Sequence, residues 1–263
     1  MSRRKGAALV TGASGGIGEE LARLFAADGT DLVLVARSRE RLQSLADELS
    51  GRHGVAARVL AKDLSEPSAP REIYEELAAG GVEVETLVNN AGFGSYGLFA
   101  ETDLAHELRL LQVNVVALTH LTKLFLPGML ARRRGYVMNV ASTAAFQPGP
   151  LMAVYYASKA YVLSFSEALS NETEGTGVVV SALCPGPTET GFVAAAGMEQ
   201  SKLFERGAMT AREVAEAGYR GMLDGKRLVI PGLRNSLVAR TVGLVPRGLI
   251  LKVVRGIQEK RAH

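Results

Sequence analysis

Short aliphatic runs alternate with longer helical patterns along most of this chain, and this alternation constrains the possible fold more than any other feature. The aliphatic runs occupy residues 7–10, 31–36, 57–61, 84–90, 135–140, 177–183 and 226–230. The helical patterns lie at residues 16–28, 38–50, 69–79, 101–130, 152–174 and 211–224. The runs lack polar alternation, as do strands buried on both faces of a parallel sheet. We therefore predict an α/β fold with a doubly wound parallel sheet.

The composition suits one large soluble domain. The chain has 263 residues, of which 47% are hydrophobic and 22% are charged, and it contains no internal repeat or low-complexity linker. Cys184 is the single cysteine, which excludes a disulfide within the chain and any site with several Cys ligands. The four histidines are far apart in the sequence, so we expect no metal.

The first residues, MSRRKGAALVTGASGG, combine basic residues with a short apolar run that glycines interrupt. A secretory signal needs a longer apolar stretch and a small-residue cleavage site. No apolar run approaches the roughly 18 residues that a membrane span requires. The sequence therefore predicts a cytoplasmic protein.

The charge is unevenly distributed along the chain. The net charge is +3, but residues 234–263 hold seven basic residues and one acid, for a local charge of +6. The preceding part holds 23 basic and 26 acidic residues and is mildly acidic, at −3. We therefore divide the chain into a body, residues 1–233, and a basic extension, residues 234–263.

A glycine-rich turn follows the first aliphatic run. Gly12, Gly16 and Gly18 lie in TGASGGIG, where a strand must turn sharply into a helix. Without side chains, the backbone can approach a pyrophosphate, whose charge the N–H groups at the helix start stabilise. The spacing G-x-x-x-G-x-G differs from the commoner G-x-G-x-x-G, and a tight connection without a ligand is the alternative. The strand–turn–helix context favours a dinucleotide site.

The end of the second run carries cations where NAD sites usually carry an acid that bonds the ribose 2′-hydroxyl. Arg37 and Ser38 occupy this place, and Arg39 and Arg41 follow. A guanidinium pairs with phosphate through two parallel hydrogen bonds, so Arg37 favours NADP(H) with its 2′-phosphate. Simple solvation of a helix start is the alternative, chiefly for Arg39 and Arg41.

Two further polar positions follow strands. Asp63, after the third run, suits either an adenine amino group or a turn. The NNAG segment, residues 89–92, follows the fourth run at the sheet edge where ligands bind in such folds. Its Asn and Gly residues suit either a tight turn or direct contact with the cofactor.

The segment VYYASKA, residues 154–160, contains a tyrosine–lysine pair suited to proton transfer. Reduction of a carbonyl needs a proton donor within hydrogen-bond reach of its oxygen. Free tyrosine has a pKa of about 10, and a nearby ammonium stabilises the phenolate and lowers that pKa. Tyr155 lies four residues and Tyr156 three residues before Lys159, and both spacings bring side chains together on a helix. The spacing alone leaves both tyrosines as candidates.

Two other polar residues suit the same chemistry. Ser142, in NVASTAA after the fifth run, has a hydroxyl that can orient a carbonyl and stabilise developing charge on its oxygen. Thr143 is its local competitor. Asn114 is an amide inside an otherwise apolar helical pattern, where a hydrogen-bonded core amide is the alternative.

Several of these motifs occur together in a familiar order: TGASGGIG, NNAG, Asn114, Ser142, the Tyr155–Lys159 pair and PGPTET, residues 185–190. In this order they resemble the short-chain dehydrogenase/reductase family, over roughly residues 5–190. The resemblance implies a Rossmann-type sheet of about seven strands and hydride transfer between NADP(H) and a carbonyl or alcohol. Its Y-x-x-x-K pattern selects Tyr155, and its serine position selects Ser142.

The resemblance also implies the roles of other residues. Asn114 would hold a water that connects Lys159 to solvent, and Lys159 would bond the nicotinamide ribose. The implied catalytic set is Asn114, Ser142, Tyr155 and Lys159, with no metal. The residues expected to contact the cofactor are Gly12, Ser14, Gly16, Ile17, Gly18, Arg37, Ser38, Asp63, Leu64, Asn90, Ala91, Gly92, Asn114, Tyr155, Lys159, Pro185, Gly186, Thr188 and Thr190. Thr190 occupies the family's threonine position.

Apolar residues near these motifs suggest a hydrophobic substrate pocket. Its expected walls are Phe93, Tyr96, Phe146, Phe192, Met198, Leu203 and Phe204. A substrate loop near 187–210 contains Gly191, Gly197 and Gly207, which suit a movable segment. We expect a small-molecule hydrophobic carbonyl substrate (a ketone, 3-oxoacyl or steroid-like compound). Ordinary packing under a loop is the alternative.

The basic extension mixes aliphatic and basic positions, broken by Pro246 and glycines. Such an amphipathic stretch suits an anionic membrane surface, a partner subunit or its own sheet, and packing on protein is favoured. The extension follows the last strand, which the family's usual tetramer uses as an interface. We therefore expect a homodimer through the helices at 101–130 and 152–174.

The main hypothesis is an NADP(H)-dependent oxidoreductase whose dinucleotide-binding catalytic domain is residues 1–233. One alternative is a non-catalytic NADP(H)-binding sensor on the same fold, against which the complete Ser–Tyr–Lys–Asn set argues. Another is a membrane-associated lipid-binding protein whose function resides in residues 234–263. We expect no nucleic-acid partner.

Overall fold

Seven parallel strands form one sheet in the computed structural model, which describes residues 6–191 and 208–259. They lie in the order β3-β2-β1-β4-β5-β6-β9, and every neighbouring pair is parallel. Their bounds are β1 Ala7–Thr11, β2 Leu32–Ala36, β3 Ala57–Ala61, β4 Val84–Asn89, β5 Gly135–Val140, β6 Val178–Leu183 and β9 Leu228–Val229. β1, β2 and β4 are buried along their whole length, because helices cover both faces. The predicted α/β fold, a Rossmann-type parallel sheet of seven strands, is confirmed.

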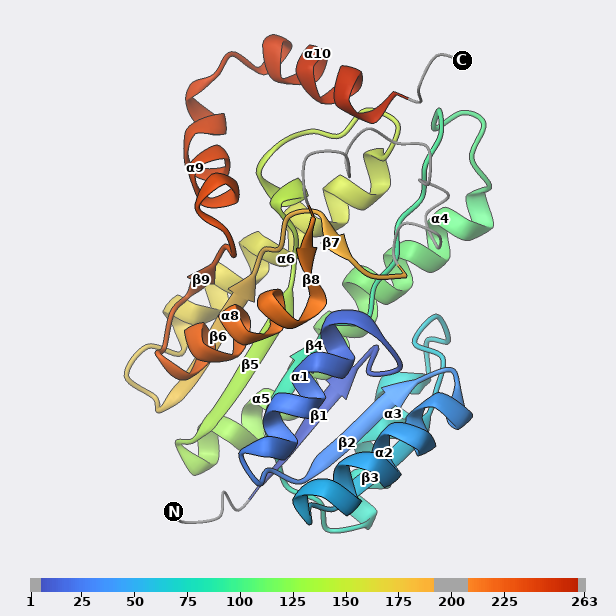
Figure 1. Ribbon diagram of the computed structural model, residues 1–263, viewed down its shortest axis with the longest axis vertical. Coiled ribbons are helices and arrows are strands. Elements are labelled where there is room, and N and C mark those ends of the chain that lie inside the picture. Colours follow the sequence, from blue (N-terminus) through green and yellow to red (C-terminus); the bar gives the residue numbers. More distant parts are fainter. Residues whose placement is uncertain (1–5, 192–207, 260–263) are drawn as a thin grey trace.

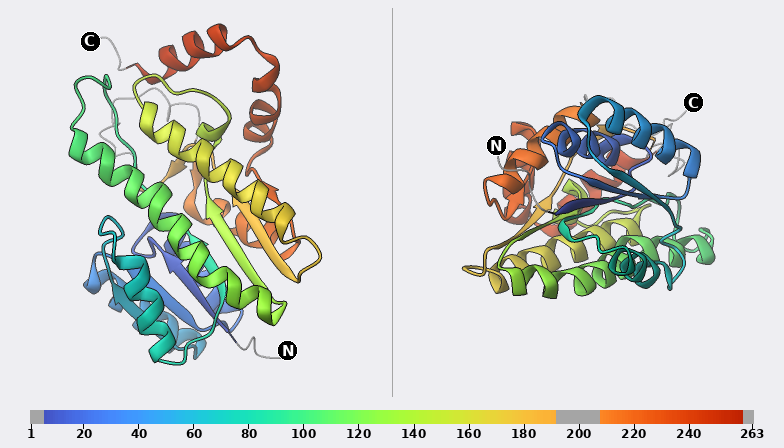
Figure 2. Two further views of the ribbon diagram at one scale, coloured as in Figure 1. Left: turned by 180° about the vertical axis from the view of Figure 1, so that it is seen from behind. Right: turned by 90° about the horizontal axis from the view of Figure 1, so that it is seen from below.

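Helices form one layer on each side of the sheet (Figure 2). One layer contains α1 (Gly16–Ala27), α2 (Arg39–His53) and α8 (Ala211–Leu223); the other contains α3 (Ala69–Ala79), α5 (Leu118–Arg132) and α6 (Ala153–Glu172). Successive side chains of a strand point to opposite faces, so β2 contributes Leu34 to one core and Val35 to the other. The sheet therefore separates two apolar cores, one on each of its faces.

The strand order reverses between β1 and β4. The chain runs from β1 to β2 and β3 on one side of this point, and from β4 to β5 and β6 on the other. Such a reversal leaves a crevice outside the carboxyl ends of the strands, where α/β proteins bind ligands. The segments that follow β1, β2, β3, β4, β5 and β6 carry the motifs singled out above.

The helical pattern predicted at 101–130 is a helix in three parts that begins later than expected. Asp103 ends the preceding loop and caps α4 (Leu104–Leu111), because its carboxylate accepts hydrogen bonds from the N–H groups of Ala105 and His106. A π-helical turn, η1 (Gln112–Ala117), separates α4 from α5 and contains Asn114. Such turns occur frequently at functional sites.

One helical stretch of the described residues, Leu104–Arg132, is long and apolar enough to cross a membrane by length and composition. In this fold its C-terminal half packs on the sheet, where Leu121, Phe125 and Met129 belong to the core. We therefore assign it as a core helix. Among the described side chains, no group of three or more His, Cys, Asp or Glu residues is placed to hold a metal ion.

After β9 the chain forms an arch over the carboxyl edge of the sheet (Figure 1). α9 (Leu233–Thr241) leads through the short 3₁₀ turn η4 (Val242–Leu244) to α10 (Arg247–Gln258), which crosses above the strand ends. We call residues 233–258 the C-terminal arch. Its inner face packs on the protein's own body, but over the end of the sheet rather than over the sheet's face.

Two short features differ from the predicted elements. The run at 226–230 contributes only Leu228–Val229 to the sheet, where they pair with Ala182 and Leu183. A second sheet, which the sequence analysis missed, pairs β7 (Thr188–Glu189) with β8 (Met209–Thr210). This pairing brings together the two ends of the expected substrate loop, whose residues 192–207 lie outside the described part of the chain.

Candidate active site

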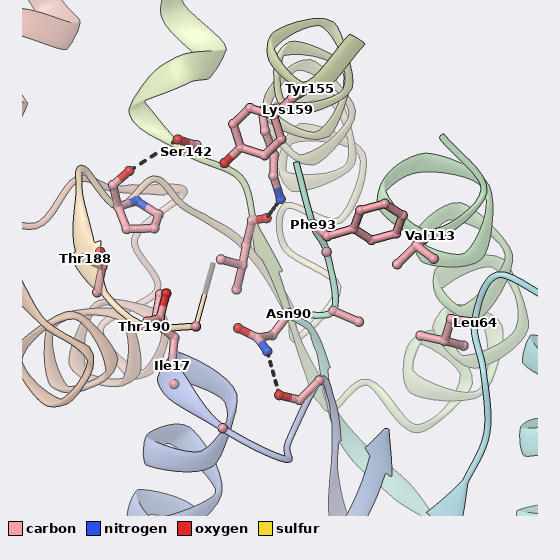
Figure 3. A pocket seen from close by; sticks show the side chains of 18 of the residues that line it. Ile17, Leu64, Asn90, Phe93, Val113, Ser142, Tyr155, Lys159, Thr188 and Thr190 are labelled. Carbon is pink, nitrogen blue, oxygen red and sulfur yellow. Dashed lines mark hydrogen bonds between the residues drawn. The ribbon is translucent and has the colours of Figure 1, made fainter. Parts of the chain in front are cut away.

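A cavity of about 960 Å³ opens at the carboxyl edge of the sheet (Figure 3). Most residues predicted to form the site line it: Gly12, Ser14, Gly16, Ile17, Arg37, Ser38, Asp63, Leu64, Asn90, Ala91, Gly92, Ser142, Tyr155, Lys159, Pro185, Gly186, Thr188 and Thr190. Gly18 and Asn114, which were expected to contact the cofactor, are not among the lining residues and contact them from behind. The volume lies at the upper end of the range for cofactor sites, roughly 300–1,000 Å³.

The glycine-rich turn forms one end of the cavity. Gly12 (φ 66°) and Gly16 (φ 58°) adopt the left-handed backbone conformation that favours glycine. Helix α1 begins at Gly16, and its N-cap, Gly15, offers no side-chain hydrogen bond to the first N–H groups. Those N–H groups are therefore available to an anion in the cavity. The turn fits the pyrophosphate of a dinucleotide.

Gly18 has a structural reason to be glycine. A Cβ at this position would lie 2.4 Å from both the Gly12 carbonyl oxygen and the Asn90 Nδ2. Gly18 therefore lies inside the turn, where the helix packs on the strand, and its contact with the cofactor stays a prediction.

Asn90 joins the two loops that flank the point where the strand order reverses. Its side-chain amide donates to the carbonyl oxygens of Thr11, at 2.9 Å, and Gly12, at 3.3 Å. The Thr11 hydroxyl accepts from the N–H groups of Asn90 and Ala91 and donates to the Val88 carbonyl oxygen. Of the two readings of NNAG, the structure shows the tight turn, with the side chain of Asn90 committed to it.

Cationic side chains line the cavity after β2. Arg37 and Arg41 are exposed, line the cavity and form no ion pair with any described residue. The Ser38 hydroxyl caps α2 by accepting from the Arg41 N–H at 3.4 Å. Arg39 does not line the cavity. The pair Arg37 and Arg41 fits a phosphate group at this end of a dinucleotide.

Asp63 lies on the cavity wall after β3. Its carboxylate accepts a hydrogen bond from the Ser65 N–H at 2.9 Å, as a turn aspartate does. The neighbouring Leu64 is buried and lines the cavity beside Val113 of η1 (Figure 3). These two apolar side chains make this part of the cavity wall hydrophobic.

Ser142 and Tyr155 face each other at the other end of the cavity. Ser142 begins a 3₁₀ turn, η2 (Thr143–Phe146), in which its hydroxyl accepts from the Ala144 N–H at 3.1 Å. A side-chain hydrogen bond links Ser142 to the Tyr155 phenol. The Thr143 N–H donates to the Pro185 carbonyl oxygen, and the Ser142 hydroxyl donates to the same oxygen at 3.5 Å. Ser142 is therefore the hydroxyl bonded to the tyrosine that the Y-x-x-x-K pattern selects.

Tyr155 is buried, and burial raises the pKa of its phenol above the ordinary value, while the hydrogen bond with Ser142 acts in the opposite direction. The sequence analysis expected the Lys159 ammonium to lower this pKa. In the structure this pKa is raised instead, because the phenol is withdrawn from water and the Lys159 Nζ lies 5.8 Å from the ring centroid. A protonated phenol is the form of Tyr155 that can donate a proton.

Lys159 lies one helical turn after Tyr155 on α6. Its Nζ donates to the Val140 carbonyl oxygen at 2.8 Å (Figure 3). Burial lowers the pKa of Lys159 to about 8, because the charged ammonium is disfavoured away from water. The side chain therefore changes its charge close to neutral pH.

Asn114 is buried in the π turn and makes three hydrogen bonds. Its amide donates to the Phe93 carbonyl oxygen and the Ser158 hydroxyl, and its Oδ1 accepts from the Phe93 N–H at 3.1 Å. A Cβ built on Gly92 would lie 3.0 Å from this Oδ1 and 3.4 Å from the Lys159 Nζ. Gly92 therefore lies beside both side chains, and a side chain at this position would crowd the Asn114 amide.

The PGPTET segment closes the cavity opposite the glycine turn. The Thr188 hydroxyl donates to the Gly186 carbonyl oxygen at 2.9 Å and supports the turn. A Cβ on Gly16 would lie 3.0 Å from the Thr190 methyl group, so Thr190 faces the glycine turn across the groove. Both threonines line the cavity.

The expected substrate walls are only partly brought together. Phe93 lines the cavity; Phe146 instead packs in a separate apolar cluster, and Tyr96 bonds the C-terminal arch. Phe192, Met198, Leu203 and Phe204 lie outside the described residues. The cavity wall near Tyr155 instead includes Met152 and Tyr156.

Sequence reasoning missed four residues that shape the site. Thr11 bonds the turn at Asn90, and Ser158 bonds Asn114. Arg109 lines the cavity, and Gln258 bonds Tyr156. Thr11 directly precedes the glycine turn, and Ser158 directly precedes Lys159, so their positions beside motifs were a usable signal. No local pattern marked Arg109 or Gln258.

Comparisons with known proteins agree with this geometry. The family model described as "short chain dehydrogenase" matches residues 6–201. The very-long-chain 3-oxoacyl-CoA reductase of Anas platyrhynchos is 37% identical over 185 residues, which cover 68% of this chain and 58% of that protein. The chain spans little more than half the length of the first curated relatives that it matches, with 58%, 52% and 60% of their lengths covered.

Two solved structures share nearly the whole fold. A short-chain dehydrogenase from Sphingobium yanoikuyae in complex with NADPH is 32% identical, with a TM-score of 0.83 and 98% of both chains covered. A 7beta-hydroxysteroid dehydrogenase is 26% identical, with a TM-score of 0.87 and 96% of this chain and 98% of that chain covered. The motif order, the sheet and these matches lead to one conclusion: the chain belongs to the short-chain dehydrogenase family.

Proposed function

We propose that this protein is an NADP(H)-dependent oxidoreductase that acts on the carbonyl or alcohol of a large hydrophobic substrate. One observation carries the proposal: a hydrogen-bonded Ser142–Tyr155 pair and Lys159 lie in the same cavity as the glycine turn and Arg37. A proton donor at one end and an anion site at the other are what reduction of a carbonyl by a dinucleotide requires.

The cofactor-binding role is assigned to residues along the cavity. The N–H groups at the start of α1 would hold the pyrophosphate, with Gly12, Ser14, Gly16 and Ile17 around it. Arg37 and Ser38 would bind the 2′-phosphate, and Arg41 lies on the same wall. Ala91, Gly92 and the PGPTET segment would line the rest of the groove. A bound nicotinamide cofactor supplies or accepts the hydride.

Tyr155 would donate the proton to the substrate oxygen during reduction, and the raised pKa of its phenol supports a protonated donor. Ser142, bonded to Tyr155, would orient the carbonyl and stabilise negative charge on its oxygen. Lys159 would bond the nicotinamide ribose. In its charged form, Lys159 would also stabilise the phenolate that proton donation leaves.

Asn114 would act behind the cavity. Its three hydrogen bonds hold the Phe93 loop and Ser158 in place. Asn114 and Lys159 both lie beside Gly92, and a water molecule held by these two side chains would return the proton from solvent. This role is a proposal for the route of proton supply, and direct contact of Asn114 with the cofactor is not part of it.

The proposed substrate carries its carbonyl on a large apolar group. Phe93, Met152 and Tyr156 line the cavity in the described residues. Relatives are named very-long-chain 3-oxoacyl-CoA reductase and 17-beta-hydroxysteroid dehydrogenase type 3, and a structural neighbour is a bulky-bulky ketone specific alcohol dehydrogenase. Long-chain 3-oxoacyl esters and steroid-like ketones are therefore the classes to test first.

The test is a screen of NADPH oxidation with ketosteroids, 3-oxoacyl esters of graded chain length, quinones and small diketones. We expect turnover with bulky apolar ketones and tighter binding of NADPH than of NADH. Cofactor binding without turnover of any of these would support the sensor hypothesis instead. Failure to bind either cofactor would overturn the proposal.

We propose a homodimer formed by the helices α4, α5 and α6. The outer surface of these helices and of η1 exposes Val116 (47%), in η1, and Tyr161 (40%), in α6, although both are large apolar side chains. Tyr161 is ordered there by stacking on Phe165 and by a hydrogen bond with Thr119. Sedimentation velocity is expected to show a dimer for the natural chain and a monomer for Tyr161→Glu. A dimer that survives this substitution would exclude this interface.

A further proposal concerns the C-terminal arch. We propose that the protein is cytoplasmic and that its arch contacts an anionic membrane surface. Between residues 234 and 258 the chain has five basic residues and no acid. The arch exposes eight large aliphatic side chains: Leu233, Leu237, Val238, Leu244, Val245, Leu249, Leu251 and Val253. A bilayer with anionic headgroups complements both features.

Vesicle flotation tests this contact. We expect binding to phosphatidylserine-containing vesicles that falls with salt, and weak binding to phosphatidylcholine alone. Leu249→Glu should reduce binding, whereas Leu108→Glu on α4 serves as a matched exposed control. Equal binding of both variants would exclude the arch as the membrane-contacting surface.

In these proposals residues 1–233 are the catalytic domain, the segment near 187–210 is its substrate loop, and residues 234–263 are an extension with functions of its own.

A further inference from the structure

Helix α10 packs on the apolar cluster that contains both tyrosines of the candidate active site. Its buried positions, Ile250, Val254 and Gln258, are four residues apart and form one stripe. They lie in or against a cluster with Leu110, Met152, Tyr155 and Tyr156. The C-terminal arch is therefore continuous with the substrate end of the cavity.

Gln258 is the polar member of this stripe, and it is fully buried. Its side-chain Nε2 donates to the Tyr156 hydroxyl at 2.5 Å, and its main-chain oxygen accepts from the Tyr96 hydroxyl at 2.6 Å. Because a buried amide is unfavourable unless it is hydrogen-bonded, these two phenols determine where the end of α10 rests. Gln258 Oε1 has no hydrogen-bond partner among the described residues.

The Tyr155 ring and the loop before α6 confine Tyr156 on two further sides. Its ring lies edge-on to the Tyr155 ring, with 6.0 Å between centroids and an interplanar angle of 76°. A Cβ built on Gly149 would lie 2.2 Å from the Tyr156 ring, so the loop before α6 closes directly on it. A shift of Tyr156 toward either neighbour must therefore move Tyr155 or this loop.

Tyr156 is a neutral part of the cavity wall near pH 7. Burial raises the pKa of its phenol to about 12, with the hydrogen bond from Gln258 acting in the opposite direction. Tyr156 thus stays protonated at neutral pH. It lines the cavity, whereas Gln258 does not, so Gln258 acts on the site only through Tyr156.

We propose that Gln258 is a positioning residue and that Tyr156 determines substrate specificity. The hydrogen bond from Tyr96 to Gln258 and the one from Gln258 to Tyr156 hold α10 against the outer side of the substrate wall. Tyr156 then presents a fixed ring to the apolar part of a bulky ketone. This inference rests on the proposed reductase function and adds to it the element that selects large substrates.

The first test needs no substrate. Trypsin can cleave the exposed arch after Arg247, Lys252 and Arg255. We expect Tyr156→Phe and Gln258→Met to raise the cleavage rate there by about fivefold, the factor that one hydrogen bond contributes. The double variant should be no more sensitive than either single variant. Tyr219→Phe, which removes a phenol bonded to Asp28 on the far side of the fold, is the matched control and should leave the rate unchanged.

The second test separates positioning from catalysis. With a bulky ketone, both variants should raise KM by about fivefold and leave kcat and the Kd for NADPH close to the natural values. With a small diketone, KM should not change. Unchanged trypsin cleavage in both variants would overturn the proposal, as would a loss of kcat with every ketone. Absence of any ketone reduction by the natural protein would instead overturn the reductase function, while the trypsin result would still decide the contact.

Discussion

The Lys159 ammonium lies 5.8 Å from the centre of the Tyr155 ring and donates to the Val140 carbonyl oxygen at 2.8 Å. Both side chains are buried, and burial disfavours the charged form of each. The pKa of Tyr155 is therefore raised, and the pKa of Lys159 falls to about 8. Near neutral pH the tyrosine is protonated, and the lysine is the group whose charge changes.

Tyr155→Phe is expected to lower kcat for ketone reduction by a factor of about 10²–10⁴, because the substrate oxygen loses its proton donor. The Kd for NADPH should not change, since the ring is retained. Stopped-flow kinetics and fluorescence titration of NADPH measure the two quantities. Tyr156→Phe is the matched control and should retain kcat. The reverse result would transfer the proton-donating role to Tyr156.

Ketone reduction is expected to slow as the pH rises through about 8, the pKa of Lys159. Above this value the lysine is neutral and cannot stabilise a phenolate on Tyr155. The profile of kcat against pH measures the effect, and Lys159→Met should be slow at every pH without this step. If kcat of Lys159→Met still fell at the same pH, the titrating group would be one other than Lys159.

The same shift predicts how Lys159 affects stability. Its pKa is lower in the folded chain, about 8, than the ordinary lysine value of 10.5, so the unfolded chain binds more protons between these values. Burial of the charged lysine therefore destabilises the fold below pH 8, and this penalty disappears as the pH rises toward 10.5. Lys159→Met should raise the free energy of unfolding at pH 7, with a smaller gain at pH 10. Urea denaturation at the two pH values measures the difference; an equal gain at both would contradict the assigned pKa.

Arg37→Asp is expected to shift cofactor preference from NADPH toward NADH by tenfold or more, about 1.4 kcal/mol, because the cation for the 2′-phosphate becomes an anion. The ratio of kcat/KM for the two cofactors measures the shift. Arg39→Asp is the matched control, since Arg39 does not line the cavity. An unchanged ratio in Arg37→Asp would remove Arg37 from the phosphate site.

Gly18→Ala is expected to reduce the free energy of unfolding by about 1–3 kcal/mol, because its Cβ would meet Gly12 and Asn90 at 2.4 Å. Gly15→Ala offers a neighbouring control, since a Cβ there has no atom within 4 Å. Its effect should stay within about 0.5 kcal/mol. Thermal unfolding of the two variants without added cofactor separates them, and equal loss in both would show that the turn tolerates a side chain at Gly18.

The layered fold was predictable because each strand signals itself locally. A strand buried on both faces needs an unbroken aliphatic run, as in DLVLVA, and the glycine-rich turn after the first strand marks where the backbone turns sharply into α1. Errors appeared where a local pattern had a tertiary cause. The helix predicted at 101–130 is interrupted by a π turn in which Asn114 bonds Phe93 and Ser158, one of them 44 residues away.

The amino-acid sequence by itself determined the sheet, the order of the motifs and the two tyrosines that compete for Lys159, because spacing along a helix is a local property. It could not assign a contact to Tyr156. Only the tertiary structure brings Gln258, 102 residues away, onto the Tyr156 hydroxyl and bonds Ser142 to Tyr155. The physical reason is that hydrogen bonds between distant segments depend on how the arch and the sheet edge pack, and no short pattern in the sequence encodes that packing.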